Sequence, residues 1–424
     1  MLQVQYLREH TQETIDRLKK RNIDAETAVN KALELDEVRR KTQQESDQLL
    51  SEANLAAKEI GSLMQAGKKE EAEVAKSKVA SIKESIKKLE DAQAQAEHLL
   101  IQHLYTIPNA PYHLVPNGKT PEENLEIRKS GTIPDLGENN LPHWELTTKY
   151  NLIDFELGVK ISGAGFPVYK GKAARLQRAL INFFLDENTR IGYTEYQVPL
   201  LVNEASGIGT GQLPDKESQM YHVGLDDLYL IPTAEVPLTN IFRDEIVKAE
   251  DLPIKLTGYT PCFRREAGSY GKDVRGLNRL HQFDKVEIVQ IQHPSKSYDA
   301  LEEMVTHVTG ILDKLKLPYR ILRLCGGDMG FASAMTYDFE VYSTAQKRWL
   351  EVSSVSNFES FQSNRLKLRF REGNEKPQLA HTLNGSALAL PRIMAGILEN
   401  YQVADGINIP EVLVPYCGFD KISL

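Results

Sequence analysis

The stretch from about residue 26 to residue 104 contains no proline and only two glycines, Gly61 and Gly67. Proline breaks an α-helix and glycine weakens one, so this stretch can form very long helices. In its second half, mostly apolar residues recur in alternating steps of three and four, which is the spacing of a coiled-coil seam. These positions are Ala72, Ala75, Val79, Ile82, Ile86, Leu89, Gln93, Ala96 and Leu100.

The first half of this stretch carries a poorer seam. It runs through Leu35, Leu49, Ala53, Ala56, Ile60 and Leu63, with Arg39, Thr42 and Ser46 interrupting it. The segment 65–68 contains a glycine and suits a reversal of direction. We therefore predict a long antiparallel helical hairpin, in which each helix of about 35 residues spans roughly 50 Å. Because two helices form only one narrow seam, we expect this arm to project from a larger body.

The role of the arm has two interpretations at this level. A dimerisation coiled coil is the simpler interpretation. The second half of the arm is rich in lysine, which usually marks a solvated helix face but could also meet phosphates. These lysines are Lys68, Lys69, Lys76, Lys78, Lys83, Lys87 and Lys88.

Length and composition limit the class of protein. A chain of 424 residues is expected to form two domains, and 41% hydrophobic with 26% charged residues is typical of a soluble globular protein. No apolar run is long enough to span a membrane, and the first residues resemble neither a secretory signal nor a transit peptide, so we expect a cytoplasmic protein without membrane contact. The net charge of -8 argues against a generally basic nucleic-acid binder, although a local basic patch remains compatible with it. The three cysteines are scattered without a C-x-x-C pair, which predicts neither a disulfide framework nor a zinc site.

The remainder of the chain has a different pattern. A connector rich in Pro, Gly and Asn runs from about 107 to 137, and Thr120-Pro121-Glu122-Glu123 within it is typical of a capped helix start. After a helix with an apolar face near residues 173–183, strand-like runs follow with few helices between them, which favours a mostly antiparallel sheet flanked by helices, an α+β fold. The runs are 195–202, 228–232, 255–265, 282–291, 320–323, 337–342 and 349–354.

Residues 260–292 read as two strands joined by a glycine-rich, basic loop that contains Lys272 and Arg275. In the second strand, period two places Phe283 and Glu287 on one face and the aliphatic Val286 and Ile288 on the other. A ring and a carboxylate on one face could hold an aromatic base and an ammonium group, although an ordinary amphipathic strand has the same pattern. The loop lacks the spacing of a P-loop.

Arg264 and Arg265 precede Glu266 on the first strand. An arginine fork suits phosphate or carboxylate oxygens, and adjacent strand residues point to opposite faces, so only one of the two can face a site. Arg392 falls in the first turns of a helical run at 393–402, where a cation opposes the helix dipole and therefore needs a ligand-related reason.

Other candidate chemistry in the sequence is limited. Glu351 and the serines that follow it supply oxygen ligands suited to Mg²⁺. No Ser/His/Asp arrangement or H-E-x-x-H motif occurs, and His281 is expected to be structural.

These segments together resemble the seryl-tRNA synthetases of bacterial type, which belong to the class II aminoacyl-tRNA synthetases. Residues 165–199 are similar to the first motif of that class, the hairpin with F-R-R-E and H-Q-F-D-K-V-E to the second, and residues 383–402 to the third. Segments 209–214, 233–235 and 350–357 match further signatures, and the helical hairpin matches the N-terminal arm. One departure is Asp215-Lys216, where the family often has Lys-Phe.

The resemblance implies a role for individual residues. Arg264 and Arg392 are implied as catalytic residues, Arg264 on the α-phosphate and Arg392 stacking the adenine against Phe283. The serine pocket is implied to contain Thr233, Ala234, Glu235, Glu287 and Ser386, with their division between ammonium and hydroxyl left open. The implied ATP-binding residues are Arg264, Arg265, Glu266, Leu280, Phe283, Glu351, Val352, Ser353, Ser354 and Arg392, with Glu351 and Ser354 as ligands of Mg²⁺ carried with ATP. The implied tRNA contacts are Lys68, Lys69, Lys272 and Arg275.

The implied organisation is an N-terminal tRNA-binding domain at 1–106, a connector at 107–138 and a catalytic domain at 139–424. The implied activity is ATP-dependent ligation of L-serine to tRNA(Ser) through seryl-adenylate, by a homodimer without zinc, and tRNA(Sec) is a second candidate substrate. Two alternatives stay open: a class II-like ligase that acts on a protein carrier, and a non-catalytic interaction protein. The full-length arm speaks against the first alternative. The intact Arg264, Glu266, Glu287, Glu351 and Arg392 speak against the second.

Overall fold

The computed structural model describes residues 1–137, 140–215, 218–267 and 275–424. The chain divides into two compact units. One comprises Leu2–Lys19 and Ile23–Pro108, and the other comprises Met1, Lys20–Asn22 and Asn109–Leu424. No helix in the described ranges has the length and apolar character needed to cross a membrane.

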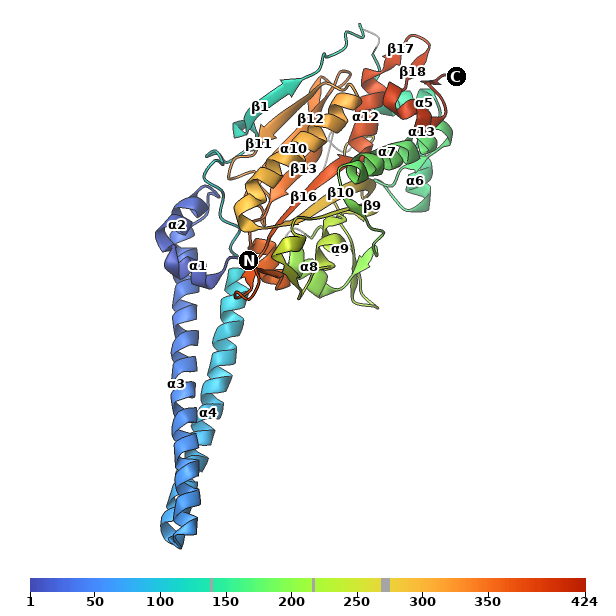
Figure 1. Cartoon of the computed structure of the whole chain (residues 1–424). Helices are drawn as coiled ribbons and strands as arrows, with labels where there is room; N and C mark the ends of the chain where they lie inside the picture. Colours follow the sequence, from blue (N-terminus) through green and yellow to red (C-terminus); the bar gives the residue numbers. More distant parts are fainter. Residues whose placement is uncertain (138–139, 216–217, 268–274) are drawn as a thin grey trace. The chain divides into compact units, whose positions relative to one another are not determined.

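The first unit is helical, and its two long helices lie side by side (Figure 1). It contains α1 (Val4–Glu9), α2 (Thr11–Lys19), α3 (Ala25–Gln65) and α4 (Lys69–Leu104). The carboxylate of Asp24 caps the start of α3 by accepting a hydrogen bond from the Thr27 N–H at 3.2 Å. Gly67 has φ +76° and makes the turn between the long helices. The predicted antiparallel hairpin is confirmed, with helices of 41 and 36 residues.

The seam between the long helices is as predicted on α4 and more polar than expected on α3. All nine predicted positions of α4 are buried or half-buried. On α3, Thr42 and Ser46 are buried parts of the seam, which confirms that polar residues intrude into it as predicted. Asp36 is also fully buried there, and its carboxylate pairs with arginines that neutralise it, so the pKa of Asp36 stays lowered despite its burial. The N···O distances are 2.6 Å to Arg8, 2.8 Å to Arg39 and 3.0 Å to Arg40.

The second unit is built on an eight-stranded sheet in the order β1-β11-β12-β13-β16-β10-β9-β4. Neighbouring strands are antiparallel except for the parallel pair β4–β9, which confirms the mostly antiparallel sheet. The strands are β1 (Leu125–Ser130), β4 (Thr194–Glu195), β9 (Ile254–Phe263), β10 (Gln282–Gln292), β11 (Tyr319–Arg323), β12 (Met335–Ser343), β13 (Arg348–Asn357) and β16 (His381–Ala389).

Smaller sheets and several helices surround the main sheet in the described residues. The short strands are β2 (Ile153–Asp154), β3 (Val168–Tyr169), β5 (Leu201–Val202), β6 (His222–Val223), β7 (Leu228–Leu230), β8 (Ile246–Lys248), β14 (Arg369–Arg371), β15 (Gln378–Leu379), β17 (Gln402–Val403), β18 (Gly406–Asn408) and β19 (Lys421–Ile422). The helices are α5 (His143–Lys149), α6 (Phe155–Ile161), α7 (Gly171–Arg190), α8 (Glu204–Thr210), α9 (Glu235–Asn240), α10 (Ser297–Lys314), α11 (Phe361–Leu366), α12 (Leu390–Asn400) and α13 (Val414–Cys417).

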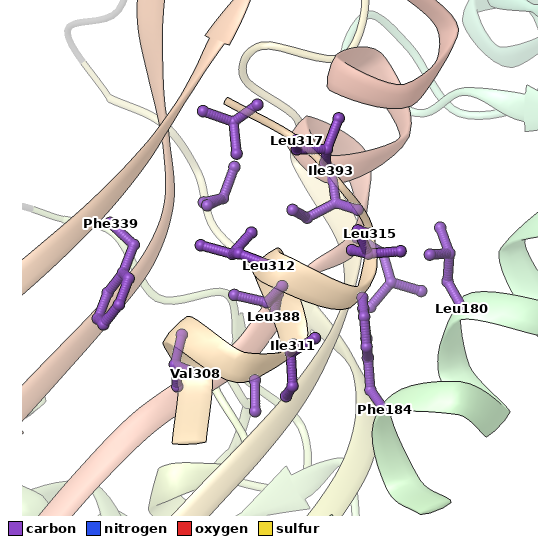
Figure 2. Packing of buried hydrophobic residues seen from close by; sticks show 14 of the residues in the cluster. Leu180, Phe184, Val308, Ile311, Leu312, Leu315, Leu317, Phe339, Leu388 and Ile393 are labelled. Atoms are coloured by element: carbon purple, nitrogen blue, oxygen red, sulfur yellow. The ribbon is translucent and has the colours of Figure 1, made fainter. Parts of the chain in front are cut away.

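Three helices, α7, α10 and α12, cover one face of the main sheet and form the largest core with it. Helix α10 lies over the sheet in Figure 1. Figure 2 shows this core at close range, with side chains from all three helices and from the sheet in contact: Leu180, Phe184, Val308, Ile311, Leu312, Leu315, Leu317, Phe339, Leu388 and Ile393. The face of β10 that carries Val286 and Ile288 belongs to this core, as predicted. The opposite face of the sheet is therefore the one left for a site.

Some predicted elements differ from the structure. The strand expected at 195–202 was wrong: only its ends are extended, as β4 and β5, and these belong to different sheets. Pro199 lies between them and has no N–H for a sheet hydrogen bond. The capped start at Thr120 is a single 3₁₀ turn (Pro121–Glu123) with a capping box and no longer helix. The other predicted strands are confirmed with bounds that shift by a few residues.

Candidate functional site

The β9–β10 hairpin places the aromatic ring and the first arginine together. Phe283 pairs with Cys262 in the ladder, and the backbone N–H of Arg264 donates to the carbonyl of His281 beyond the last strand residue. The guanidinium carbon of Arg264 lies 5.3 Å from the centre of the Phe283 ring, which is a cation–π distance. A phosphate-binding group thus lies next to a ring that can stack on a base.

Four of the five residues of the implied serine pocket lie together around β10 and β16. Glu287 and Ser386 are opposite each other in the ladder between these strands. The Thr233 hydroxyl donates to Glu287 Oε2 at 3.4 Å and accepts from the Glu235 N–H at 3.2 Å. All four side chains are buried, so a small polar ligand in contact with them would lose most of its water. Ala234, the fifth residue, is buried too, but it packs with Leu238 and Val289 in a small apolar core.

The pocket holds two buried carboxylates with different partners. Glu287 forms an ion pair with Lys285 at 2.6 Å. Glu235 accepts a hydrogen bond at 2.6 Å from the amide Nε2 of Gln362. Burial and the negative charge of Glu287 raise the pKa of Glu235 to about 7, and the Gln362 hydrogen bond opposes this rise. An added ammonium group would favour the ionised form of Glu235.

A β-bulge in β13 brings the two candidate magnesium ligands to one face of the sheet. Glu351 lies opposite Glu340, whereas Ser353 lies opposite Phe339, so Val352 is the extra residue. Glu351 and Ser354, three positions apart, consequently share the face of Glu340 and Asp338. Regular period two would have placed them on opposite faces. Val352 and Ser353 are buried, and the Ser353 hydroxyl donates to the carbonyl of Ser386 at 2.5 Å.

The donor set at the bulge fits a hard cation such as Mg²⁺. Ser354 donates its hydroxyl to Asp338 Oδ1 at 2.6 Å. Burial and the nearby Glu351 raise the pKa of Asp338 well above its usual range, and an added cation would relieve this. Within the described ranges, no three His, Cys, Asp or Glu side chains gather as a complete metal site. This agrees with Mg²⁺ chemistry, in which one or two carboxylates act together with substrate phosphates and water.

Arg392 lies in the first turn of α12, as predicted, and connects the third candidate segment to the second. Its Nε donates to the carbonyl of Asn278 at 3.0 Å, and a terminal nitrogen donates to the carbonyl of Glu351 at 2.8 Å. The Asn278 amide donates to Gln346 Oε1 at 3.1 Å. Gln346 in turn donates to Glu399 Oε1 at 3.0 Å, so the guanidinium is held by a continuous polar network.

The same network supports the end of the loop. His143 Nδ1 donates to Glu399 Oε1 at 2.7 Å, and its Nε2 accepts from the Leu277 N–H at 2.8 Å. Both side chains are fully buried. Glu399 also accepts from the Ser343 hydroxyl, and its pKa stays lowered despite burial because of His143 and Ser343.

The remaining predicted residues lie at or near the loop between β9 and β10, except for two lysines in the helical unit. Glu266, with φ +48°, pairs with Arg279 at 2.9 Å. The Arg265 N–H donates to the carbonyl of Gln219, and Leu280 is buried. Arg275 lies 5.4 Å over the Trp144 ring. Lys272, like Lys216 of the Asp215-Lys216 departure, falls outside the described residues.

Lys68 and Lys69 belong to the helical unit, at the turn of its hairpin, where Lys68 pairs with Glu71 at 3.0 Å. His281 bonds to the Tyr221 hydroxyl and stacks on Phe166, which agrees with a structural role.

Several residues of the site were not found from the sequence. Lys285 was noticed only as a strand residue, and Asp338, Asn278 and Gln362 were not singled out. The alternation of β10 could have indicated Lys285, because it shares a face with Glu287. The other three reach the site only through the pairing of distant strands and helices, for which no local pattern exists.

The antiparallel sheet with helices on one face, together with a hairpin that carries Arg264 and Phe283, defines the class II synthetase type of catalytic domain. Residues 221–401 match the family model "tRNA synthetase class II core domain (G, H, P, S and T)". Residues 1–111 match "Seryl-tRNA synthetase N-terminal domain".

Comparison of whole chains gives the particular family. The chain is 50% identical to the serine–tRNA ligase of Salinibacter ruber, over 100% of this chain and 99% of that one, and 49% identical to the serine–tRNA ligase of Neisseria meningitidis serogroup B, over 99% and 98%. The crystal structure of seryl-tRNA synthetase from Pyrococcus horikoshii complexed with ATP is similar with a TM-score of 0.94 at 33% identity, and covers 100% of this chain and 99% of that one. The chain belongs to the seryl-tRNA synthetase family of class II aminoacyl-tRNA synthetases.

Proposed function

We propose that this chain activates L-serine with ATP and transfers the seryl group to the 3′ end of tRNA(Ser), with tRNA(Sec) as a second candidate substrate. The observation that carries the proposal is the convergence of Thr233, Glu235, Glu287 and Ser386 on one side of the hairpin that also bears Arg264 and Phe283. The relatives named above are serine–tRNA ligases over the full length of the chain.

In the first step, the serine carboxylate attacks the α-phosphorus of ATP in line, forming seryl-adenylate and releasing pyrophosphate. Arg264 neutralises charge on the α-phosphate and the attacking carboxylate, and Arg392 with Phe283 holds the adenine. Both reactants are already competent, so positioning supplies much of the rate. Glu351 and Ser354 would hold the Mg²⁺ that accompanies ATP, and this ion would supply positive charge to the phosphates.

The serine side chain is selected by hydrogen bonding and by space. Glu235 and Glu287 supply acceptors for the ammonium and hydroxyl groups of serine, and Thr233 and Ser386 supply hydroxyls. A buried site built to bond a hydroxyl rejects alanine strongly because its polar groups would be left unpaired. Threonine is refused by lack of space.

In the second step, the 3′-hydroxyl of the tRNA's terminal adenosine attacks the adenylate carbonyl and releases AMP. Lys272 and Arg275, both in the basic loop segment of the sequence, guide that end of the tRNA in this proposal. Lys68 and Lys69, at the tip of the arm, supply charge for tRNA phosphates, a recognition that depends on RNA shape more than on base sequence. Homodimer formation, the cytoplasmic location, the absence of zinc and the domain boundaries at 106 and 138 stay predictions from the sequence.

A panel of amino acids in ATP–pyrophosphate exchange, followed by charging of total tRNA, tests the proposal. We expect exchange that depends on serine, and charging of serine tRNA in preference to a protein carrier. Exchange without charging would favour the carrier ligase, and absence of serine-dependent exchange would overturn the proposed activity.

A further inference from the structure

The buried amide of Gln362 contacts the serine pocket without being part of it. Gln362 lies in α11 and is 1% exposed. Its Nε2 donates to Glu235 Oε1 at 2.6 Å and to the carbonyl of Thr210 at 3.1 Å. Its Oε1 accepts from the Thr382 hydroxyl at 2.6 Å. Both N–H groups and the carbonyl oxygen are therefore committed to partners from three elements of the fold.

These partners fix the orientation of the amide. If the oxygen and nitrogen exchanged places, the oxygen would face the Thr210 carbonyl and the Glu235 carboxylate, which are both acceptors. The Thr382 hydroxyl adds to this preference because it donates to the oxygen in the observed orientation. Gln362 thus presents a donor to Glu235 in a defined direction.

The second oxygen of Glu235 has a different environment. Among the residues that the structure describes, no donor reaches Glu235 Oε2, and this oxygen is not one of the fully buried unpaired atoms, so it stays open to a ligand. A carboxylate with one oxygen fixed and the other without a donor suits a ligand that brings its own N–H or O–H groups. Serine brings both.

We propose that Gln362, oriented by Thr382, is a positioning residue that fixes the Glu235 carboxylate for recognition of the amino-acid substrate. This inference rests on the proposed function, because it takes Glu235 as part of the amino-acid pocket. Gln362 touches neither ATP nor the reacting atoms in this scheme. Its effect is therefore expected on amino-acid affinity, with ATP affinity and the chemical step much less affected.

The test compares Gln362→Met with the wild-type full-length chain in ATP–pyrophosphate exchange. Methionine has a similar length and no donor. The bond lost is one to a charged group, so we expect KM for serine to rise about tenfold to a hundredfold, with KM for ATP changed less than about twofold. Equal changes in both KM values, or no change, would contradict the proposal.

Gln290→Met is the matched control. Gln290 is also 1% exposed, and its amide donates to the Tyr193 hydroxyl, away from the carboxylate pocket. We expect its KM for serine to stay within about twofold of wild type. A rise like that of Gln362→Met would show a general effect of losing a buried amide, and would also contradict the proposal.

Thr382 supplies a second variant in case Gln362→Met does not fold. Thr382→Val removes the hydroxyl that orients the amide, whereas Thr382→Ser keeps it. We expect KM for serine to rise in Thr382→Val and to stay near wild type in Thr382→Ser. If both behave alike, orientation of Gln362 by this hydroxyl is wrong.

A pH profile separates positioning from general support. The Gln362 hydrogen bond lowers the pKa of Glu235, so loss of this donor should move the inflection in KM for serine to higher pH. The other charged groups around Glu235, which are Glu287, Lys285 and Arg264, are unchanged in the variant. An unmoved inflection would count against the proposal. If the wild type activates another amino acid in place of serine, the proposed function fails, while the effect of Gln362 is still measured with that amino acid.

Discussion

The two buried carboxylates in the pocket around β10, Glu235 and Glu287, differ in the charge of their partners. Lys285 forms a direct ion pair with Glu287, whereas the side-chain donor to the Glu235 carboxylate among the described residues is a neutral amide. Glu235 therefore holds its proton up to about pH 7. The sequence predicted Glu235 and Glu287 as pocket residues through the family resemblance, but it could not predict which of them lacks a countercharge. That difference depends on the distances to Lys285 and Gln362.

Glu235→Gln is expected to remove a pH dependence from the stability of the ligand-free protein. Burial and Glu287 raise the pKa of Glu235 from 4.5 to about 7, so the folded state keeps a proton that the unfolded state releases. The wild type then loses about 3 kcal/mol of unfolding free energy from this group as pH rises from about 4.5 to 7. Urea unfolding at pH 4 and pH 8 measures it. The variant should lack this loss and should bind serine far more weakly.

Comparing the variant with the wild type cancels the contribution of other groups that titrate in this range. An identical fall in stability in both proteins would contradict the raised pKa of Glu235.

Two elements of the site depend on contacts with segments that are distant in the chain. The bulge at Val352 brings Glu351 and Ser354 to one face of β13, although regular alternation would separate them. Gly276, in the loop between β9 and β10, has φ +65° and lies against His143. The sequence predicted the strands on both sides of this loop, but neither the bulge nor the histidine contact has a local signature. Both arise from pairing with segments far away in the chain.

Gly276→Ala is expected to destabilise the protein by about 2 kcal/mol or more, through a left-handed backbone and a steric clash. An added Cβ would lie 2.3 Å from His143 Nε2, which accepts the Leu277 N–H. Chemical denaturation measures the change. The neighbouring Asn278 carbonyl holds Arg392, so we also expect a higher KM for ATP.

Gly310→Ala is the control. It lies within α10, and an added Cβ meets nothing within 4 Å. Alanine is the better helix former, so a gain of about 0.5–1 kcal/mol is expected. Similar destabilisation of both variants would mean that the contact with His143 is not the cause.

At the scale of the whole molecule, the chain divides into a helical unit and a unit that contains the β9–β10 hairpin and the sheet around it. All residues proposed for serine, ATP and Mg²⁺ belong to the second unit. The helical unit has its own seam and its own buried ion-pair cluster around Asp36. The two steps of the proposed reaction should therefore have different requirements, because only transfer involves the large RNA substrate.

Deletion of about Glu26–Leu100 is expected to leave serine-dependent ATP–pyrophosphate exchange largely intact. Charging of tRNA should fall by about two orders of magnitude or more, since the phosphate contacts of the arm are lost. Both activities are measured on the same preparation, beside the full-length chain. Equal loss of the two would show that the arm supports the catalytic unit itself.

The sequence by itself determined the features that depend on local spacing. The three-and-four repeat gave the helical hairpin, and period two gave the faces of β10. The sequence also predicted that Arg392 lies at the start of its helix. Only the tertiary structure decided which side chains meet across long stretches of chain. Gln362 reaches Glu235 across 127 positions, and Asn278 reaches Arg392 across 114. The physical reason is that periodicity reports which face of an element is apolar, whereas the partners of a buried polar group are set by the order and register of strands in the folded sheet.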